Sequence, residues 1–471
     1  MSALTNLLLF SQALVVLYFL FVNLLYMVLF CFSVWAIVDH LRHMKHRDLR
    51  EITRSKLTPP ISILVPAHNE SAVIIASVSA LLQLDYPEFE ILVVNDGSTD
   101  DTLATLIGAF GLRATRRIYH QTVATRPVRC IYAARPETPW ANLIVVDKEK
   151  GGKADALNAA INVSHYPLFC SMDADSLLEK DSLLRVVMPF MERFSSMVGV
   201  GGIVRVANGC RIVDGTVQSV RLPDRWLPCF QAVEYLRAFL SGRVAWGRLR
   251  SLLVLSGAFA LFRKSAIIES GGYDTNTVGE DMELVMRLHH ERRKKGADCE
   301  IAFIPDPVCW TEVPETLRML WRQRNRWQRG LGQSLVKHRE MLLNPRYGLI
   351  GLVATPYLGL VEFASPVLEF MGYGVFVAAY FEGVLRWNAF GAFMVLSVLM
   401  GINLSLLSVL LEEFTLHRYP SVFDLLKLLA ASVLEHLGYR HFTNLARLQG
   451  TLDTARRSLA WGHLERKGVE L

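Results

Sequence analysis

The stretch Leu168-Phe169-Cys170-Ser171-Met172-Asp173-Ala174-Asp175 decides the fold of the central part of the chain. Its first five residues form a short, mainly apolar run with the length of a buried strand, and two carboxylates follow directly. Uninterrupted apolar strands are typical of parallel sheets that are covered on both faces. Ligands bind such sheets beyond the carboxyl ends of the strands, so Asp173 and Asp175 stand where a ligand site is expected.

The segments on either side repeat this pattern. Short β-rich runs alternate with helical stretches between residue 58 and about residue 310, which predicts βαβ units and a mostly parallel sheet. The expected strands are Ile61–Val65, Ile91–Asn95, Leu143–Val146 and Leu168–Met172, and the expected helices lie near 70–83, from Ser98 or Thr99 onward, at 153–162 and at 178–190.

Carboxylates stand at the ends of two of these strands. Asp96-Gly97-Ser98-Thr99-Asp100 follows the second strand, where it is favourable chemistry for a helix N-cap or, alternatively, a ligand site. Asp173 and Asp175 are two positions apart and can both reach one divalent cation. Mg²⁺ and Mn²⁺ prefer such oxygen ligands and commonly bridge to substrate phosphates. The alternative is a cap for the helix at 178–190.

Two further motifs combine glycine with a charged residue. Gly151-Gly152-Lys153 lies between two expected strands, where the glycines allow close backbone approach and Lys153 can meet a phosphate. Its spacing differs from that of the NTPase P-loop. Gly279-Glu280-Asp281 opens an expected amphipathic helix. Acidic residues are favourable at a helix N-terminus, and a positioned general base is the other interpretation.

Apolar zones flank this central domain. The chain has 471 residues, of which 52% are hydrophobic and 20% charged, and its mean hydropathy is +0.28. This composition excludes a disordered chain, a collagen and a small disulfide scaffold, and it indicates membrane segments. Residues 7–38 predict either one tilted membrane helix or two helices hinged near Asn23. Basic residues from His40 to Arg50 follow and mark the cytoplasmic side.

The second apolar zone runs from Tyr347 to about Tyr439. It predicts two full spans with interfacial or re-entrant pieces, or four short spans. Glu362, Glu369 and Glu435 lie inside it. A carboxylate at that depth usually faces a cavity or a partner, and a place at the membrane interface is the alternative.

The segment from Pro314 to about Leu343 joins the central domain to this zone. It is basic and amphipathic and it contains tryptophan, which predicts a helix on the membrane surface whose basic residues mostly anchor it to anionic lipid.

Charge and cysteine content exclude other classes of protein. The chain has 50 Lys+Arg and 44 Asp+Glu, and the resulting charge of +6 is too mild to indicate a nucleic-acid partner. The seven cysteines form no CxxC pair, so neither a disulfide framework nor a zinc site is indicated. A reducing compartment is the simpler interpretation.

The order of the motifs is more specific than any single motif. Together they resemble the membrane-integrated family 2 glycosyltransferases, which include the cellulose, chitin, hyaluronan and poly-N-acetylglucosamine synthases. The resemblance is strongest to the bacterial poly-N-acetylglucosamine type. It is carried, over residues 58–340, by Val65-Pro66-Ala67-His68-Asn69-Glu70, Val94-Asn95-Asp96-Gly97-Ser98, Gly152-Lys153-Ala154 with Leu157-Asn158, Asp173-Ala174-Asp175, Gly279-Glu280-Asp281 and Gln323-x-x-Arg326-Trp327.

The resemblance implies a role for each motif. The family's GT-A fold binds a nucleotide sugar at the carboxyl edge of its sheet. Asp281 would be the general base that deprotonates the acceptor hydroxyl, and Asp175 would be the direct ligand of Mg²⁺ or Mn²⁺. The donor would contact Pro66, Glu70, Asp96, Lys153, Asp173, Gln323 and Arg326, and the acceptor would contact Ser256, Gly257, Glu280 and Trp327.

The implied architecture is an α/β GT-A-type nucleotide-sugar-binding domain plus an α-helical transmembrane region. The expected parts are an N-terminal transmembrane segment at 1–45, a cytosolic GT-A domain at 58–312, an amphipathic interfacial helix with the QxxRW motif at 313–345, transmembrane and interfacial helices at 346–440, and a basic cytosolic tail at 441–471.

The implied activity is inverting transfer of a sugar from a UDP-sugar to the end of a growing β-linked polysaccharide, coupled to its export. Expected partners are the UDP-sugar, the polysaccharide, membrane lipid and an export or accessory protein, without nucleic acid. The expected location is the plasma membrane (the inner membrane of a bacterium), with the catalytic domain in the cytoplasm.

Two rival functions follow from the same residues. A non-processive transferase that adds one sugar to a membrane lipid shares these carboxylates, and a continuous polar or aromatic path through the spans would argue against it. Candidates for such a path are Tyr357, Glu362, Tyr373 and Trp387. A non-enzymatic scaffold or transporter with a degenerate transferase domain predicts lost carboxylates, and all of them are present. The sequence does not distinguish glucose from N-acetylglucosamine as the transferred sugar.

Overall fold

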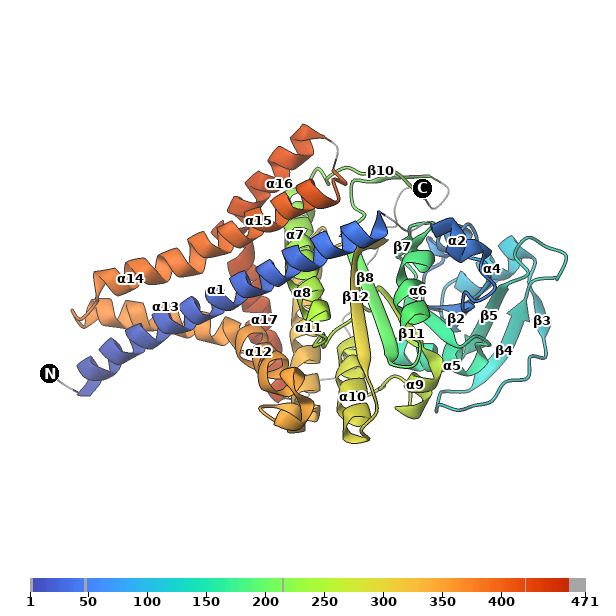
Figure 1. Cartoon of the computed structure of the whole chain (residues 1–471), viewed down its shortest axis with the longest axis horizontal. Helices are drawn as coiled ribbons and strands as arrows, with labels where there is room; N and C mark the ends of the chain where they lie inside the picture. Colours follow the sequence, from blue (N-terminus) through green and yellow to red (C-terminus); the bar gives the residue numbers. More distant parts are fainter. Residues whose placement is uncertain (1–2, 46–48, 214–215, 420, 457–471) are drawn as a thin grey trace.

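The computed structural model describes residues 3–45, 49–213, 216–419 and 421–456. A domain built around one large sheet lies on one side of the molecule, and long helices extend from its other side (Figure 1). Helices α7, α8, α11 and α17 lie between these two parts.

The large sheet has ten strands in the order β3-β4-β5-β2-β1-β6-β11-β8-β12-β7. Its centre is parallel: β1 pairs with β2 and β6, and β2 pairs with β5. The bounds are β1 Ile61–Ala67, β2 Phe89–Asp96, β3 Arg113–Thr115, β4 Val128–Ala133, β5 Leu143–Lys148, β6 Leu168–Met172, β7 Leu177–Leu178, β8 Met197–Val206, β11 Phe259–Arg263 and β12 Glu300–Thr311. Strands β9 (Arg211–Val213) and β10 (Thr216–Ser219) form a separate antiparallel pair.

The expectation of a mostly parallel sheet is correct only for this centre. Strands β3, β4, β7 and β11 pair antiparallel with their neighbours, while β8 and β12 are parallel to each other. Strand β11 runs in the opposite direction to β6. The chain turns at Ser256, which pairs with Phe259, and then continues as β11 beside β6. The parallel strands are nonetheless the ones whose carboxyl ends carry Asp96 and Asp173, so the sheet edge forms as expected.

Three of the four expected helices of this domain begin later than the sequence pattern predicts. Helix α4 (Thr102–Phe110) starts after Asp100, whose carboxylate accepts a hydrogen bond from the amide of Thr102 at 3.0 Å. Helix α6 (Ser182–Glu192) starts late because Leu177 and Leu178 pair with β12 as strand β7. The remaining helices are α2 Leu49–Arg54, α3 Ile74–Leu81, α5 Lys153–Val163, α7 Trp226–Leu236, the π-helical segment Arg237–Arg243, α8 Val244–Arg248, α9 Lys264–Glu269 and α10 Glu280–Lys294.

The N-terminal apolar zone is one continuous helix, α1 (Ala3–Met44). The side-chain amide of Asn23 donates to the backbone oxygens of Phe19 and Leu396, so this polar residue is accommodated without a hinge. At its other end α1 contacts the sheet domain, where His40 Nε2 lies 2.6 Å from the carboxylate of Asp306 in β12. The helix therefore links the apolar region directly to the sheet.

The C-terminal apolar zone is helical, and its α-helices are α12 Thr355–Tyr357, α13 Ser365–Phe381, α14 Trp387–Met394, α15 Met400–Thr415 and α16 Val422–Leu434. Segments of π-helix adjoin them at Ile350–Ala354, Leu358–Phe363 and Val395–Leu399. Short 3₁₀ turns lie before and within the zone at Arg339–Met341, Pro345–Tyr347 and Glu435–Leu437. Among the described residues, α1 and Trp387–Thr415 are long and apolar enough to cross a membrane. Two further helical segments, Ile350–Phe363 and Ser365–Phe381, meet at a bend of 51°. If the two segments together cross the membrane once, they form a third span.

The residues after the apolar zone fold back onto the rest of the protein. Helix α17 (Tyr439–Ala455) packs along α11 (Leu317–Lys337), as the two adjacent ribbons in Figure 1 show. Asn325 of α11 donates to Asp453 of α17 at 2.8 Å. Up to Ala455, the segment expected to be a basic tail is thus a packed helix, and residues 457–471 of that tail lie outside the described residues.

Candidate functional site

A cavity of about 1660 Å³ opens at the carboxyl ends of β1, β2 and β6. Every residue to which the motifs assign a role lines it. These are Pro66, Glu70, Asp96, Lys153, Asp173, Asp175, Ser256, Gly257, Glu280, Asp281, Gln323, Arg326 and Trp327. The topology of the sheet thus brings together six motifs that are spread over more than half of the chain.

Asp96 organises the glycine turn on the neighbouring strand end. It is 3% exposed, and its two carboxylate oxygens accept hydrogen bonds from the amides of Gly151 at 2.9 Å and Gly152 at 2.7 Å. Lys148 is fully buried and lies 2.7 Å from the same carboxylate. Asp96 does not cap α4, which begins six residues later. The N-cap interpretation is therefore wrong, and the carboxylate shapes the wall of the cavity.

Lys148 is a residue that the motifs did not reveal. It ends β5 and stands opposite Asp96 in the parallel register, and it also lies 2.5 Å from Asp155. It lies in the charged run Asp147-Lys148-Glu149-Lys150, so no local signal distinguishes it from its exposed neighbours.

Lys153 holds the centre of the site. Its Nζ lies 2.5 Å from Asp173 and 3.5 Å from Glu280, and it donates to the backbone oxygen of Gly257 at 3.2 Å. Burial alone would lower the pKa of Lys153, but the charges of Asp173 and Glu280 raise it above its ordinary value. The side chain is therefore a permanent positive charge between the carboxylates of two motifs.

Glu280 and Asp281 occupy the first turn of α10. Asp281 Oδ2 accepts a hydrogen bond from the amide of Gly257 at 2.9 Å, which fixes the carboxylate at the cavity wall. Glu280 is 7% exposed and turns toward Lys153, and burial raises its pKa, assisted by the neighbouring charge of Asp281. The two adjacent acids thus differ in their contacts. Asp281 is oriented by a backbone amide, and Glu280 is held in a buried ion pair with Lys153.

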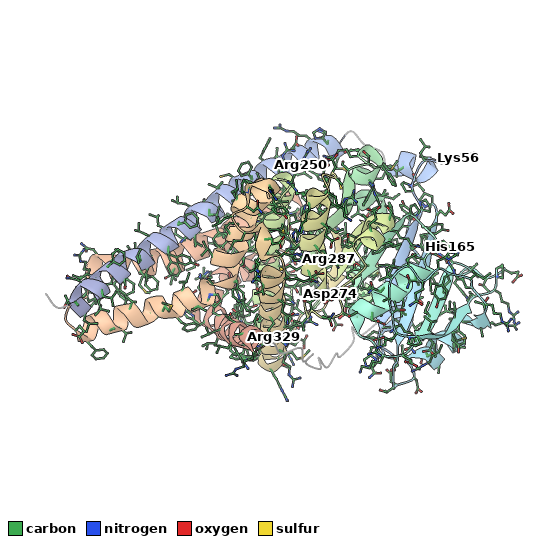
Figure 2. The ribbon with its side chains drawn as sticks, turned by 90° about the horizontal axis from the view of Figure 1, so that it is seen from below. Lys56, His165, Arg250, Asp274, Arg287 and Arg329 are labelled. Carbon is green, nitrogen blue, oxygen red and sulfur yellow. The ribbon has the colours of Figure 1, made fainter. Side chains whose placement is uncertain are left out.

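Helix α11 forms the facing wall and carries Gln323, Arg326 and Trp327. Thr316 caps its first turn by accepting a hydrogen bond from Met319. It crosses the start of α10 at a glycine contact: a Cβ built on Gly330 would lie 2.8 Å from the Cα of Gly279. Only two residues without side chains let these backbones meet so closely. Figure 2, which views the molecule from below, labels Arg329 of α11 together with Asp274 and with Arg287 of α10.

The basic residues of α11 are mostly partners of protein groups. Arg324 is 2% exposed, lies 2.7 Å from Glu234 of α7 and stacks 4.2 Å from the ring centre of Trp327. Lys337 lies 2.6 Å from Asp274, and Arg329 is 5% exposed. The interpretation as lipid anchors is therefore wrong for Arg324 and Arg329, which are buried, whereas Arg318, Lys337 and Arg339 are exposed.

The cavity continues from this site into the apolar helices. Tyr18, Asn23 and Tyr26 of α1 line it, as do Tyr357 and Glu362. Tyr373 and Trp387, the other candidates for a path, are not among its lining residues: Tyr373 donates to Glu369, and Trp387 is 67% exposed. Two of the four candidate residues for a path, Tyr357 and Glu362, therefore line the cavity.

The three carboxylates in the apolar zone have protein partners. Glu362 accepts from Tyr357 at 2.6 Å and lines the cavity, while Glu369 is 2% exposed and accepts from Asn444 at 2.9 Å. Glu435 is also 2% exposed and pairs with Arg237 at 2.5 Å. These contacts match the expectation of a cavity or a partner, since a carboxylate inside an apolar region needs compensation.

The family model for glycosyltransferase like family 2 matches residues 59–330. Similar proteins include the poly-β-1,6-N-acetyl-D-glucosamine synthases of Staphylococcus epidermidis, 29% identical over 278 residues, and of Staphylococcus aureus strain COL, 28% identical over 278 residues. Each match covers 59% of this chain and 56% of the relative, so the chain spans little more than half the length of these relatives.

Among solved structures, the mannosyltransferase PcManGT from Pyrobaculum calidifontis in complex with GDP-Man and Mn²⁺ is similar in fold. It superposes with a TM-score of 0.50 at 19% identity, covering 89% of this chain and 99% of that chain. The expected α/β fold of the GT-A type with added apolar helices is thereby confirmed. Because the family model covers the whole sheet domain and the QxxRW helix, this chain belongs to glycosyltransferase family 2.

Proposed function

We propose that this protein is a membrane glycosyltransferase that extends a β-linked polysaccharide, with inversion, from a UDP-sugar donor. The observation that carries the proposal is the single cavity that joins the carboxylate-lined sheet edge to the apolar helices. N-acetylglucosamine is the sugar named in the similar synthases, so UDP-N-acetylglucosamine is the proposed donor.

The donor would lie over the carboxyl ends of β1, β2 and β6. Pro66, Glu70 and the turn that Asp96 holds would receive the nucleoside. Lys153 and Arg326 supply positive charge for the diphosphate, and Gln323 lies one helical turn before Arg326. A positive wall around the leaving group stabilises the charge that develops as the sugar departs.

Asp281 would act as the general base on the acceptor side. The acceptor hydroxyl gives its proton to this carboxylate, its oxygen forms a bond to C1 of the sugar, and the bond from C1 to the diphosphate oxygen breaks, so that UDP leaves. The hydrogen bond from Gly257 orients the carboxylate for this step. Ser256, Gly257 and Trp327 would contact the acceptor, and Glu280 would act on it through its pairing with Lys153.

A divalent cation fits this chemistry. Asp173 and Asp175 both line the cavity next to the proposed diphosphate position, and Mg²⁺ and Mn²⁺ usually take one or two carboxylates together with substrate phosphates. Asp173 already lies against Lys153, which leaves Asp175 as the proposed direct ligand. When bound, the cation would neutralise charge on the diphosphate.

The inner part of the helical region offers the product a way out of the site. Tyr26, Tyr357 and Trp246 present rings to the continuous cavity, and sugar faces stack well on such rings. We place the sheet domain on the cytoplasmic side of the plasma membrane (in bacteria the inner membrane), because Arg42 and Lys45 follow the apolar part of α1. Membrane lipid and an export or accessory protein are the further proposed partners.

The decisive experiment uses the full-length protein in nanodiscs with a panel of radiolabelled UDP-sugars and Mg²⁺ or Mn²⁺. Polymer made from UDP-N-acetylglucosamine and degraded by a linkage-specific hydrolase supports the proposal. Label that appears only in lipid would favour single transfer to a lipid acceptor instead. No turnover of any UDP-sugar would reject the proposal.

Asp281→Asn tests the assignment of the base. We expect transfer to fall about 10²- to 10⁴-fold, with affinity for UDP-N-acetylglucosamine close to that of the unmodified protein. Asp85→Asn is the matched control, because Asp85 is exposed and does not line the cavity. Loss of donor affinity together with transfer would contradict the assignment.

A further inference from the structure

One arginine of the cavity wall differs from the others in its environment. Three other arginines that line the cavity have a carboxylate partner. Arg237 lies 2.5 Å from Glu435 and Arg324 lies 2.7 Å from Glu234. Arg447 lies 3.7 Å from Glu362. Arg243, at the end of the π-helical segment after α7, lines the same cavity. Within the ranges that the structure describes, its Nη1 is buried and has no hydrogen-bond partner.

The guanidinium of Arg243 is nevertheless fixed in position. It lies 4.2 Å from the ring centre of Phe239, which precedes it by four residues in the same segment. Stacking on a ring occupies one face of the guanidinium and leaves its edge, with the N–H groups, directed away. The segment that carries it is continuous with α7 and α8, so the charge is held rigidly at the cavity.

The surroundings of Arg243 place it on the acceptor side. Asp281, the proposed base, and Tyr235 are the two ionisable groups that act on it electrostatically, and both line the cavity. Burial lowers the pKa of Arg243 to about 10, and these two groups oppose the shift, so the side chain is charged at neutral pH.

A guanidinium N–H that is buried without an acceptor, as the Nη1 group of Arg243 is among the described residues, costs free energy unless a ligand supplies that acceptor. Guanidinium N–H groups donate hydrogen bonds most favourably to the oxygens of planar groups, which are carboxylates and amide carbonyls. We propose that Arg243 is a specificity-determining residue that donates hydrogen bonds to the acetamido carbonyl of the terminal acceptor sugar. This inference rests on the proposed function, since it assumes an N-acetylhexosamine polymer as the acceptor.

The test compares acceptors that differ only at this group. Full-length protein in nanodiscs is given UDP-N-acetylglucosamine and one of three tetrasaccharides, which end in N-acetylglucosamine, in glucosamine or in glucuronate. We expect the unmodified protein to use the N-acetylated end about 10- to 100-fold better in kcat/KM than the glucosamine end, as for a hydrogen bond to a charged group. In Arg243→Gln this preference should shrink toward one, through a higher acceptor KM, with the donor KM unchanged.

Two further variants keep the result interpretable. Arg243→Lys retains the charge without the planar fork and should keep part of the preference. Arg250→Gln is the control, because Arg250 follows on the same stretch of chain but does not line the cavity, and it should behave as the unmodified protein. Unchanged donor KM in Arg243→Gln also shows that the variant is folded.

Three outcomes would overturn the inference. A preference for the glucuronate end would reassign Arg243 to a carboxylate, and an unchanged preference in Arg243→Gln would remove it from acceptor recognition. A shifted pH profile of kcat with the preference intact would mean that Arg243 acts only on Asp281. Absence of turnover in the unmodified protein would instead reject the proposed function.

Discussion

The contact between Gly330 of α11 and Gly279 before α10 makes a quantitative prediction for Gly330→Ala. The new Cβ would lie 2.8 Å from the Cα of Gly279, whereas ordinary contacts begin at 3.4 Å, so the helices must separate by about 0.6 Å to restore an ordinary contact. The separation acts on the site itself, because Asp281 lies two residues after Gly279 and Trp327 lies three residues before Gly330.

The expected effect is larger on activity than on stability. A misplacement of about 1 Å between reacting groups can cost about 10²-fold in rate, so a shift of this size should reduce kcat about tenfold. Overpacking costs about 1–3 kcal/mol, and replacing glycine by alanine in a helix returns about 1 kcal/mol. The free energy of unfolding should therefore fall by about 0–2 kcal/mol.

The assay measures sugar transfer and thermal unfolding of the full-length protein in nanodiscs. Gly279→Ala should reproduce the defect, because its Cβ would lie 2.8 Å from the Cα of Gly330. Gly108→Ala in α4 is the control, since no atom lies within 4 Å of its added Cβ. Full activity of Gly330→Ala would refute the view that the close crossing of α10 and α11 positions the reacting groups.

Three other predictions concern single charged residues. Asp175→Ala should weaken donor binding only when Mg²⁺ or Mn²⁺ is present, and calorimetry that shows unchanged metal dependence would contradict its proposed role. Arg324→Leu should destabilise the protein by about 3–5 kcal/mol in thermal unfolding, because it removes the cation beside Glu234 and leaves that carboxylate, among the described residues, only the hydroxyl of Tyr439, and a second change, Glu234→Leu, should restore much of that loss. Burial alone would raise the pKa of Glu283, but His338, Arg287 and Lys337 lower it to about 2. The stability that Glu283 contributes is then complete above pH 4.5 and is lost as the pH falls toward 2, so Glu283→Gln should flatten this part of the pH profile, and an unchanged profile would contradict the pairing.

Much of the sheet domain could be predicted from local patterns. Leu168–Met172 is a strand with the bounds that its apolar run indicates, and α5 begins at Lys153 as expected. Strand propensity, apolar periodicity and the position of a carboxylate after a strand are properties of neighbouring residues. Because parallel strands end at one edge, these local signals also predicted that Asp96 and Asp173 would share a cavity.

The sequence alone could not decide what the charged residues contact. The basic residues of α11 have the same pattern whether they face lipid or protein, and only the packing of α17 on α11 buries Arg324 and Arg329. Asp96 has the chemistry of a helix cap, but the parallel register places it beside Lys148, 52 residues away.

By itself, the sequence determined that this chain has an α/β domain with carboxylates after its strands, a long apolar segment near its N-terminus and the motifs of its family. Only the tertiary structure decided that one cavity joins the sheet edge to the apolar helices and that, among the described residues, the buried Nη1 of Arg243 in its wall has no hydrogen-bond partner. The physical reason is that secondary structure follows from interactions between near neighbours in the chain. Ion pairs, buried charges and cavities depend instead on which distant segments meet.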